Sequence, residues 1–154
     1  MLYPVFLTLH SILRWLVVLA ALLAIIRAVT GLSFKRGWMG LDNRAGSWFT
    51  ILMDVQVLIG IILYFFLSPT TRLAMQNFGG AMGDSVTRFF AVEHVIGMLL
   101  AVVAAHVGRA LVRRAPNAPA KHRRTLIWFS LSLIILLASI PWPFLPAGAG
   151  RGWF

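Results

Sequence analysis

Four long apolar stretches alternate with short polar ones along the chain. The apolar stretches cover about residues 5–28, 47–67, 85–112 and 125–145. Each has the roughly 20 predominantly apolar residues that a helix needs to cross a bilayer. The pattern predicts an all-α integral membrane protein, a single domain of four transmembrane helices over residues 1–154. Short connections favour an up-down-up-down bundle in which the first and third helices lie diagonally opposite each other.

The charge of the connections predicts the orientation of this bundle. The second connection, residues 70–83, has Arg72 as its only basic residue, whereas the first and third are strongly basic. Their Lys and Arg residues, including those at the edges of the apolar stretches, are Arg27, Lys35, Arg36, Arg44, Arg109, Arg113, Arg114, Lys121, Arg123 and Arg124. The positive-inside rule places these two connections in the cytoplasm and both termini outside, in the periplasm of a bacterial inner membrane.

Composition narrows the class of protein. The chain is 60% hydrophobic and has a net charge of +10. Because its basic residues lie between apolar stretches, they suit anionic lipid head groups better than nucleic acid. The chain has no cysteine, which rules out disulfides, iron–sulfur clusters and covalently attached c-type haem. Soluble enzymes and nucleic-acid-binding proteins are therefore excluded.

Ionisable residues interrupt the first and third apolar stretches. His10 and Arg14 lie in the first, and Arg88, Glu93 and His94 begin the third. At about 1.5 Å per helical residue, His10 lies roughly 8 Å and His94 roughly 9–13 Å inside the outer face of the membrane. Ionisable groups at such depth need partners inside the protein or a water-filled cavity. We therefore expect the two histidines to face each other across the bundle.

Two interpretations fit this cluster. Two imidazoles facing each other across a four-helix bundle hold b-type haem in some cytochromes, which makes His10 and His94 candidate iron ligands. Arg14 and Arg88 are then candidate partners of the haem propionates, with Arg88 nearer the outer surface. Alternatively, the histidines are interhelical hydrogen-bond partners, and His10 meets Glu93 or a backbone carbonyl. In either case Glu93 is expected to pair with Arg14 or Arg88.

A second polar layer is expected nearer the cytoplasm. Asp54 in the second stretch and His106 in the third lie at similar depth, and we predict a structural pair between them or between Asp54 and Arg27. No histidine on another helix matches the depth of His106, since His122 is assigned to the third connection. Arg109 is expected to extend its side chain to the surface. Apolar residues separate the two layers, which disfavours a proton path.

One face of the second stretch carries Gln56, Gly60 and Tyr64 at successive helical turns. The glycine permits close contact between helices, and the two polar side chains suit hydrogen bonds across the bundle. Binding of a quinone head group by Gln56 and Tyr64 is the alternative. Close packing is the preferred interpretation.

Several motifs resemble a family of small bacterial four-span membrane proteins that is often labelled cytochrome b-like. The similarity covers nearly the whole chain and implies that His10 and His94, with Arg14 and Glu93 beside them, form the important cluster. Similar members carry a histidine near the position of Asp54, so the aspartate here argues against a second metal site. The motifs are Leu9-His10-Ser11-Ile12-Leu13-Arg14-Trp15, Gln56-Val57-Leu58-Ile59-Gly60, Leu63-Tyr64-Phe65, Arg88-Phe89-Phe90-Ala91-Val92-Glu93-His94 and Ser139-Ile140-Pro141-Trp142-Pro143-Phe144.

These observations give two main hypotheses. The first is a b-type cytochrome-like electron-transfer subunit with one haem near the outer face, passing electrons between quinol and a partner. The second is a cofactor-free accessory subunit of a larger respiratory or photosynthetic membrane complex, able to hold lipid or pigment at its edge. Neither requires independent catalytic activity. A transporter or proton channel needs a continuous polar path, which the sequence does not show.

Overall fold

The computed structural model describes residues 2–150, and this part of the chain is helical without any β-strand. The long elements are α1 (Leu2–Ser33), α2 (Gly40–Ile62), α6 (His94–Arg113) and α7 (Ala118–Ala138). Two π-helical turns extend them, η1 (Leu63–Leu67) after α2 and η2 (Phe89–Glu93) before α6. The short elements are α3 (Pro69–Gln76), α4 (Phe78–Gly83), α5 (Ser85–Arg88) and the 3-10 turn η3 (Pro146–Gly148). The expectation of an all-α fold is confirmed.

Three helices are long and apolar enough to cross a membrane: Leu2–Ser33, Gly40–Leu67 and Ser85–Arg113, counting the π-helical turns as continuous. The fourth long helix, α7, is not among them because its first turns carry Lys121, Arg123 and Arg124. Asn117 caps this helix by accepting a hydrogen bond from the backbone N–H of Ala120, so α7 begins seven residues before the expected boundary. It ends at Ala138, well before residue 145.

The second connection contains two short helices. Ser68 caps α3, whose first residue is Pro69, a position where proline costs no helical hydrogen bond. Asn77 caps α4 by accepting from the backbone N–H of Gly80. Asp84 then caps α5 by accepting from the backbone N–H of Thr87, and this bond lowers the pKa of the Asp84 carboxyl. Capping side chains thus divide this segment into separate helical turns.

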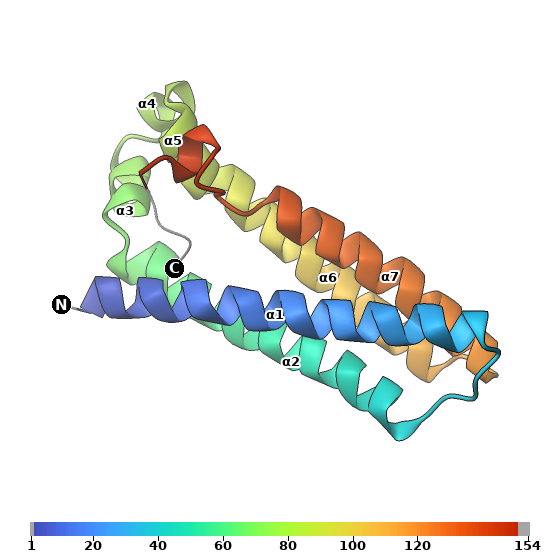
Figure 1. Cartoon of the computed structure of the whole chain (residues 1–154). Helices are drawn as coiled ribbons and strands as arrows, with labels where there is room; N and C mark the ends of the chain where they lie inside the picture. Colours follow the sequence, from blue (N-terminus) through green and yellow to red (C-terminus); the bar gives the residue numbers. More distant parts are fainter. Residues whose placement is uncertain (1, 151–154) are drawn as a thin grey trace.

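The long helices form a four-membered bundle. Helix α1 packs against α2 and α7, and α6 packs against α7 and α2, so α1 and α6 occupy opposite corners. Figure 1 shows the α1–α2 pair separating from the α6–α7 pair toward the end of the molecule that carries α3, α4 and α5. We call this the open end and the opposite one, where the basic connections lie, the basic end.

Small residues fill the core toward the basic end. Buried alanines from three helices meet there: Ala20, Ala21, Ala24, Ala45, Ala101 and Ala105. Phe49 and Phe129 are fully buried, with ring centroids 5.0 Å apart, and occupy the remaining space between α2 and α7. Gly108 lets α7 approach α6 so closely that a Cβ there would overlap Trp128. Helix association without a water-driven hydrophobic effect depends on such small residues, because they let backbones approach.

Candidate functional site

His10 and His94 come together at the open end of the bundle. Their ring centroids are 6.3 Å apart, and the ring planes are inclined by 67°. Two imidazoles on opposite sides of one metal ion, with bonds of about 2.0–2.1 Å and ring centres about 1.1 Å behind each nitrogen, have centroids roughly 6.3 Å apart. The separation across the α1–α6 diagonal therefore fits two ligands of a shared metal.

The Nδ1 atom of His94 lies 2.8 Å from the carbonyl oxygen of Ser139, just after the end of α7. A carbonyl oxygen only accepts, so Nδ1 donates a hydrogen and Nε2 keeps its lone pair. Histidines that bind a metal through one ring nitrogen usually donate a hydrogen bond from the N–H of the other in this way. Gly97 makes the contact feasible, because a Cβ at that position would overlap the Ser139 hydroxyl oxygen.

Helix α2 holds His10 from the other side. The side-chain amide of Gln56 donates to the backbone carbonyl of His10 at 3.0 Å, and a Cβ on Gly60 would lie 3.4 Å from His10 Cε1. Within the described residues, the buried atoms His10 Nδ1 and Gln56 Oε1 have no hydrogen-bond partner. Buried polar atoms normally have a hydrogen-bond partner, so these two atoms are available to interact with a ligand. The stripe expected to provide close packing therefore also holds a histidine.

Both histidines line a cavity of about 640 Å³, within the range of small-molecule and cofactor sites. Most of its lining is apolar, from Leu7, Val17, Met53, Val57, Met98 and Val102 among others. Its polar lining includes Ser11, Gln56, Tyr64 and Arg14. Arg14 also has its guanidinium carbon 5.4 Å from the centre of the Trp15 ring, a cation–π distance. Among the described residues that line the cavity, Arg14 is therefore the one Lys or Arg side chain.

Arg88 and Glu93 form a separate pair at the open end. Arg88 Nε donates to Glu93 Oε1 at 2.8 Å and Nη1 donates to the carbonyl oxygen of Met82 at 3.1 Å. Neither residue of this pair lines the cavity. The expected Arg88–Glu93 pairing is present, and the reason is the π-helical turn η2, which brings residues five apart onto one side. Arg88, a candidate propionate partner, is therefore occupied elsewhere.

Asp54 and His106 form the second polar layer, as expected. Asp54 Oδ1 lies 2.7 Å from His106 Nε2, and both side chains are about half exposed, by 53% and 47%. This layer does not touch the cavity, since neither residue lines it. The alternative pair of Asp54 with Arg27 does not form, because Arg27 Nε lies 2.6 Å from Asp42 Oδ1 instead.

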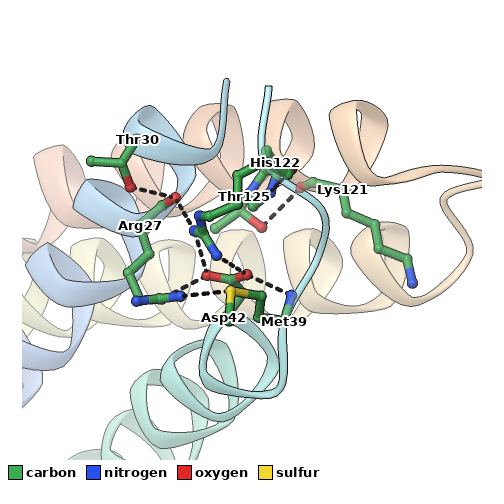
Figure 2. A network of polar contacts seen from close by, with 8 residues as sticks. Arg27, Thr30, Met39, Asp42, Lys121, His122 and Thr125 are labelled. Atoms are coloured by element: carbon green, nitrogen blue, oxygen red, sulfur yellow. Dashed lines mark hydrogen bonds and ion pairs between the residues drawn. The ribbon is translucent and has the colours of Figure 1, made fainter. Parts of the chain in front are cut away.

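Asp42 organises a network that sequence reasoning missed. It is 3% exposed and accepts from Arg27, from Arg36 at 3.0 and 3.1 Å and from the backbone N–H of Met39 at 2.7 Å. Figure 2 shows Asp42 between the Arg27 side chain and the main chain of Met39. The single acid among the basic residues of the first connection was the available signal, because a lone carboxylate there has several cations to bind.

Two further expectations at the basic end are wrong. His122 is not in a connection: it lies in α7, is fully buried, and its Nε2 is 3.2 Å from the Arg36 carbonyl oxygen. Its ring fills the space that Gly31 leaves, where a Cβ would overlap it.

Arg109 does not extend to the surface. It is 7% exposed and donates to Asn43 Oδ1 at 2.9 Å and to Ser47 Oγ at 2.7 Å. These two acceptors on α2 bind Nη2 of the guanidinium inside the bundle, whereas the buried Nε has no partner within the described residues. The residue instead ties α6 to the first turns of α2.

Comparisons with known proteins find no match: no family model, curated protein or solved structure is similar to this chain.

Proposed function

We propose that this chain is an integral-membrane, b-type cytochrome-like electron-transfer protein that binds one haem between His10 and His94. The observation that carries the proposal is the 6.3 Å separation of two imidazole rings that both line a cavity of about 640 Å³. The hydrogen bond from His94 Nδ1 to the Ser139 carbonyl oxygen supports the proposal, because this bond leaves the lone pair of Nε2 available to a metal.

The residues present fit a haem better than a bare metal ion. Within the described residues there is no group of three or more His, Asp or Glu side chains able to hold a metal. A haem brings its own ring nitrogens, so His10 and His94 would suffice to hold it, and it would supply a one-electron redox couple. Among the described residues, Arg14 is the cation that lines the cavity and is the favoured partner of a propionate, whereas Arg88 would first have to leave Glu93.

The proposal includes the membrane arrangement. We infer four spans, with α7 as the fourth, and both termini on the outer face of a bacterial inner membrane. The exposed residues of α7 beyond its basic first turns support this, since Ile127, Leu131, Ile134 and Ala138 are all apolar. The basic first and third connections support the orientation. The haem would then lie toward the outer face, where a quinol or a neighbouring subunit of a respiratory complex can exchange electrons with it.

A cofactor-free accessory subunit is the second candidate. It is favoured by the same bond between His94 and Ser139, since interhelical hydrogen bonds also stabilise membrane bundles without any cofactor. Under this interpretation the cavity holds lipid or pigment, and the histidines have a structural role.

A reduced-minus-oxidised absorption spectrum of the protein purified in mild detergent distinguishes the two functions. We expect a sharp b-type α-band at about one haem per chain. His10→Ala and His94→Ala should each abolish the bis-histidine spectrum, whereas the matched control His106→Ala should leave it intact. A flat spectrum from folded protein supports the accessory subunit, and a spectrum that survives His94→Ala ends the ligand assignment.

A further inference from the structure

The outward faces of the long helices differ in one respect. From Leu2 to Val29 the exposed residues of α1 include no ionisable group, and the same holds for α7 from Thr125 to Ala138. The face shared by α2 and α6 carries the Asp54–His106 pair, with side chains 53% and 47% exposed. This face is therefore the exception among surfaces that are otherwise suited to lipid.

In the proposed membrane arrangement, the pair lies inside the bilayer rather than at its surface. Asp54 is seven residues inside the expected start of its span and His106 seven residues before the end of α6, which is roughly 10 Å of helix in each case. Exposed neighbours along both helices are large and apolar, among them Leu58 and Val103. Ionisable groups within a membrane face the protein interior or a cavity, and seldom face lipid. The exposed Asp54–His106 pair departs from this rule, so we expect another protein surface to cover it in the membrane.

The exposed residues around the pair repeat with the spacing of a helix–helix contact. A seam on α2 consists of Ile51, Asp54, Leu58 and Ile61, and one on α6 of Leu99, Val103, His106 and Ala110; Val55, Leu100 and Val107 are exposed beside them. Alternating steps of three and four residues form the seam that packs against another helix in left-handed bundles. Each seam has a single ionisable residue, and the two lie side by side.

We propose that the α2–α6 face is a homodimer interface in the membrane and that a second copy of this chain covers the Asp54–His106 pair. A two-fold axis along the membrane normal brings α2 of one protomer opposite α6 of its partner. Asp54 of one protomer then faces His106 of the other at the same depth. After such a rotation, the acid of each Asp54–His106 pair faces the base of the partner's pair, so no two like groups lie opposite each other. The result is a four-residue cluster shielded from lipid.

This cluster sets the specificity of the contact. Interhelical hydrogen bonds in membranes contribute modestly each, so the two Asp54–His106 pairs select the face and the apolar seams provide the packing. The polar part of the interface is separate from the proposed haem site, because Asp54 and His106 do not line the cavity, whereas Ile61 and Leu99 of the seams do.

The experiment is a dilution series of fluorescently labelled full-length protein in lipid vesicles, read by energy transfer between protomers. The Asp54→Leu/His106→Leu double variant avoids leaving one charge unpaired, and we expect it to weaken dimerisation by about tenfold. Leu58→Ala on the seam should weaken it as well. Leu19→Ala is the matched control on α1, since the two leucines are 61% and 59% exposed, and it should have no effect.

Cross-linking locates the interface independently, because the chain has no cysteine of its own. A short bis-maleimide should join protomers of Val103→Cys and not those of Ile134→Cys, an equally exposed position on α7. Protein that stays monomeric at high protein-to-lipid ratio overturns the proposal. So does a dimer that cross-links through α7, or a dimer unaffected by the double variant. A different membrane protein found on the α2–α6 face in place of a second copy also overturns it.

Discussion

The two ends of the bundle show opposite ways to handle polar groups inside a membrane protein. At the basic end, helices meet through alanine and glycine, and Asp42 and Arg109 form hydrogen bonds between elements, although Arg109 Nε and His122 Nδ1 have no hydrogen-bond partner within the described residues. At the open end, the helices separate around a cavity, and the residues His10 and Gln56, whose buried atoms Nδ1 and Oε1 have no partner within the described residues, line that cavity. The basic end is closely packed, and the open end has a cavity whose polar lining is available to a ligand. Four experiments test this contrast.

The largest expected effect comes from Asp42→Ala. The substitution leaves Arg27 and Arg36 without their shared carboxylate at a buried position, so the free energy of unfolding should fall by about 3 kcal/mol. Unfolding of the purified protein in mixed detergent micelles measures this value. Asp42→Asn is the control, because it retains an acceptor for the Met39 N–H and should lose less. Equal stability of both variants and the wild type would remove the basis for the contrast.

The same glycine-to-alanine change should act differently at the two ends. Gly31→Ala forces a methyl group into the fully buried ring of His122, and such overpacking costs about 1–3 kcal/mol of unfolding free energy. Gly60→Ala brings a methyl group only to 3.4 Å from His10 Cε1, beside a cavity that accommodates a small shift. Thermal unfolding followed by circular dichroism should show a clear loss for the first variant and little for the second. The opposite ranking would contradict the packing difference.

Gly97→Ala should damage the open end mainly in its ligand chemistry. The added methyl group displaces Ser139 and with it the carbonyl oxygen that accepts from His94. Loss of such an orienting partner typically costs about 10–100-fold in affinity for a bound metal group. Haem titration of the apoprotein measures the change. Gly79→Ala, where a methyl group meets nothing within 4 Å, is the control and should bind like the wild type.

The smallest effect is expected from Arg88→Gln. Its pair with Glu93 is nearly half exposed, so the free energy of unfolding should change by less than about 1 kcal/mol. Because Arg88 does not line the cavity, the haem spectrum should stay unchanged, while Arg14→Gln should lower haem affinity. A comparison of haem retention in the two variants through gel filtration decides between the arginines. Loss of haem from the Arg88 variant alone would reverse their roles.

The sequence by itself determined the helices and singled out the polar residues within them. Long apolar stretches predict helices whatever their packing, because a backbone in lipid must satisfy its own hydrogen bonds. The same reasoning identified four residues, because an ionisable group within an apolar stretch can be recognised from the sequence alone. They are His10, His94, Asp54 and His106. Matching depth along two helices was enough to expect the His10–His94 and Asp54–His106 contacts, which are both present.

Only the tertiary structure decided which side of each helix these residues occupy and what surrounds them. A π-helical turn rotates the residues before His94 relative to those after it, so Arg88 meets Glu93 instead of the cavity. The early start of α7 buries His122 against Gly31, and acceptors on α2 retain Arg109 inside the bundle. The separation of the helix pairs, which creates the cavity, depends on contacts between segments far apart in the chain. The rotation of each helix and the separation of the helix pairs result from many such contacts together, and no local sequence pattern predicts them.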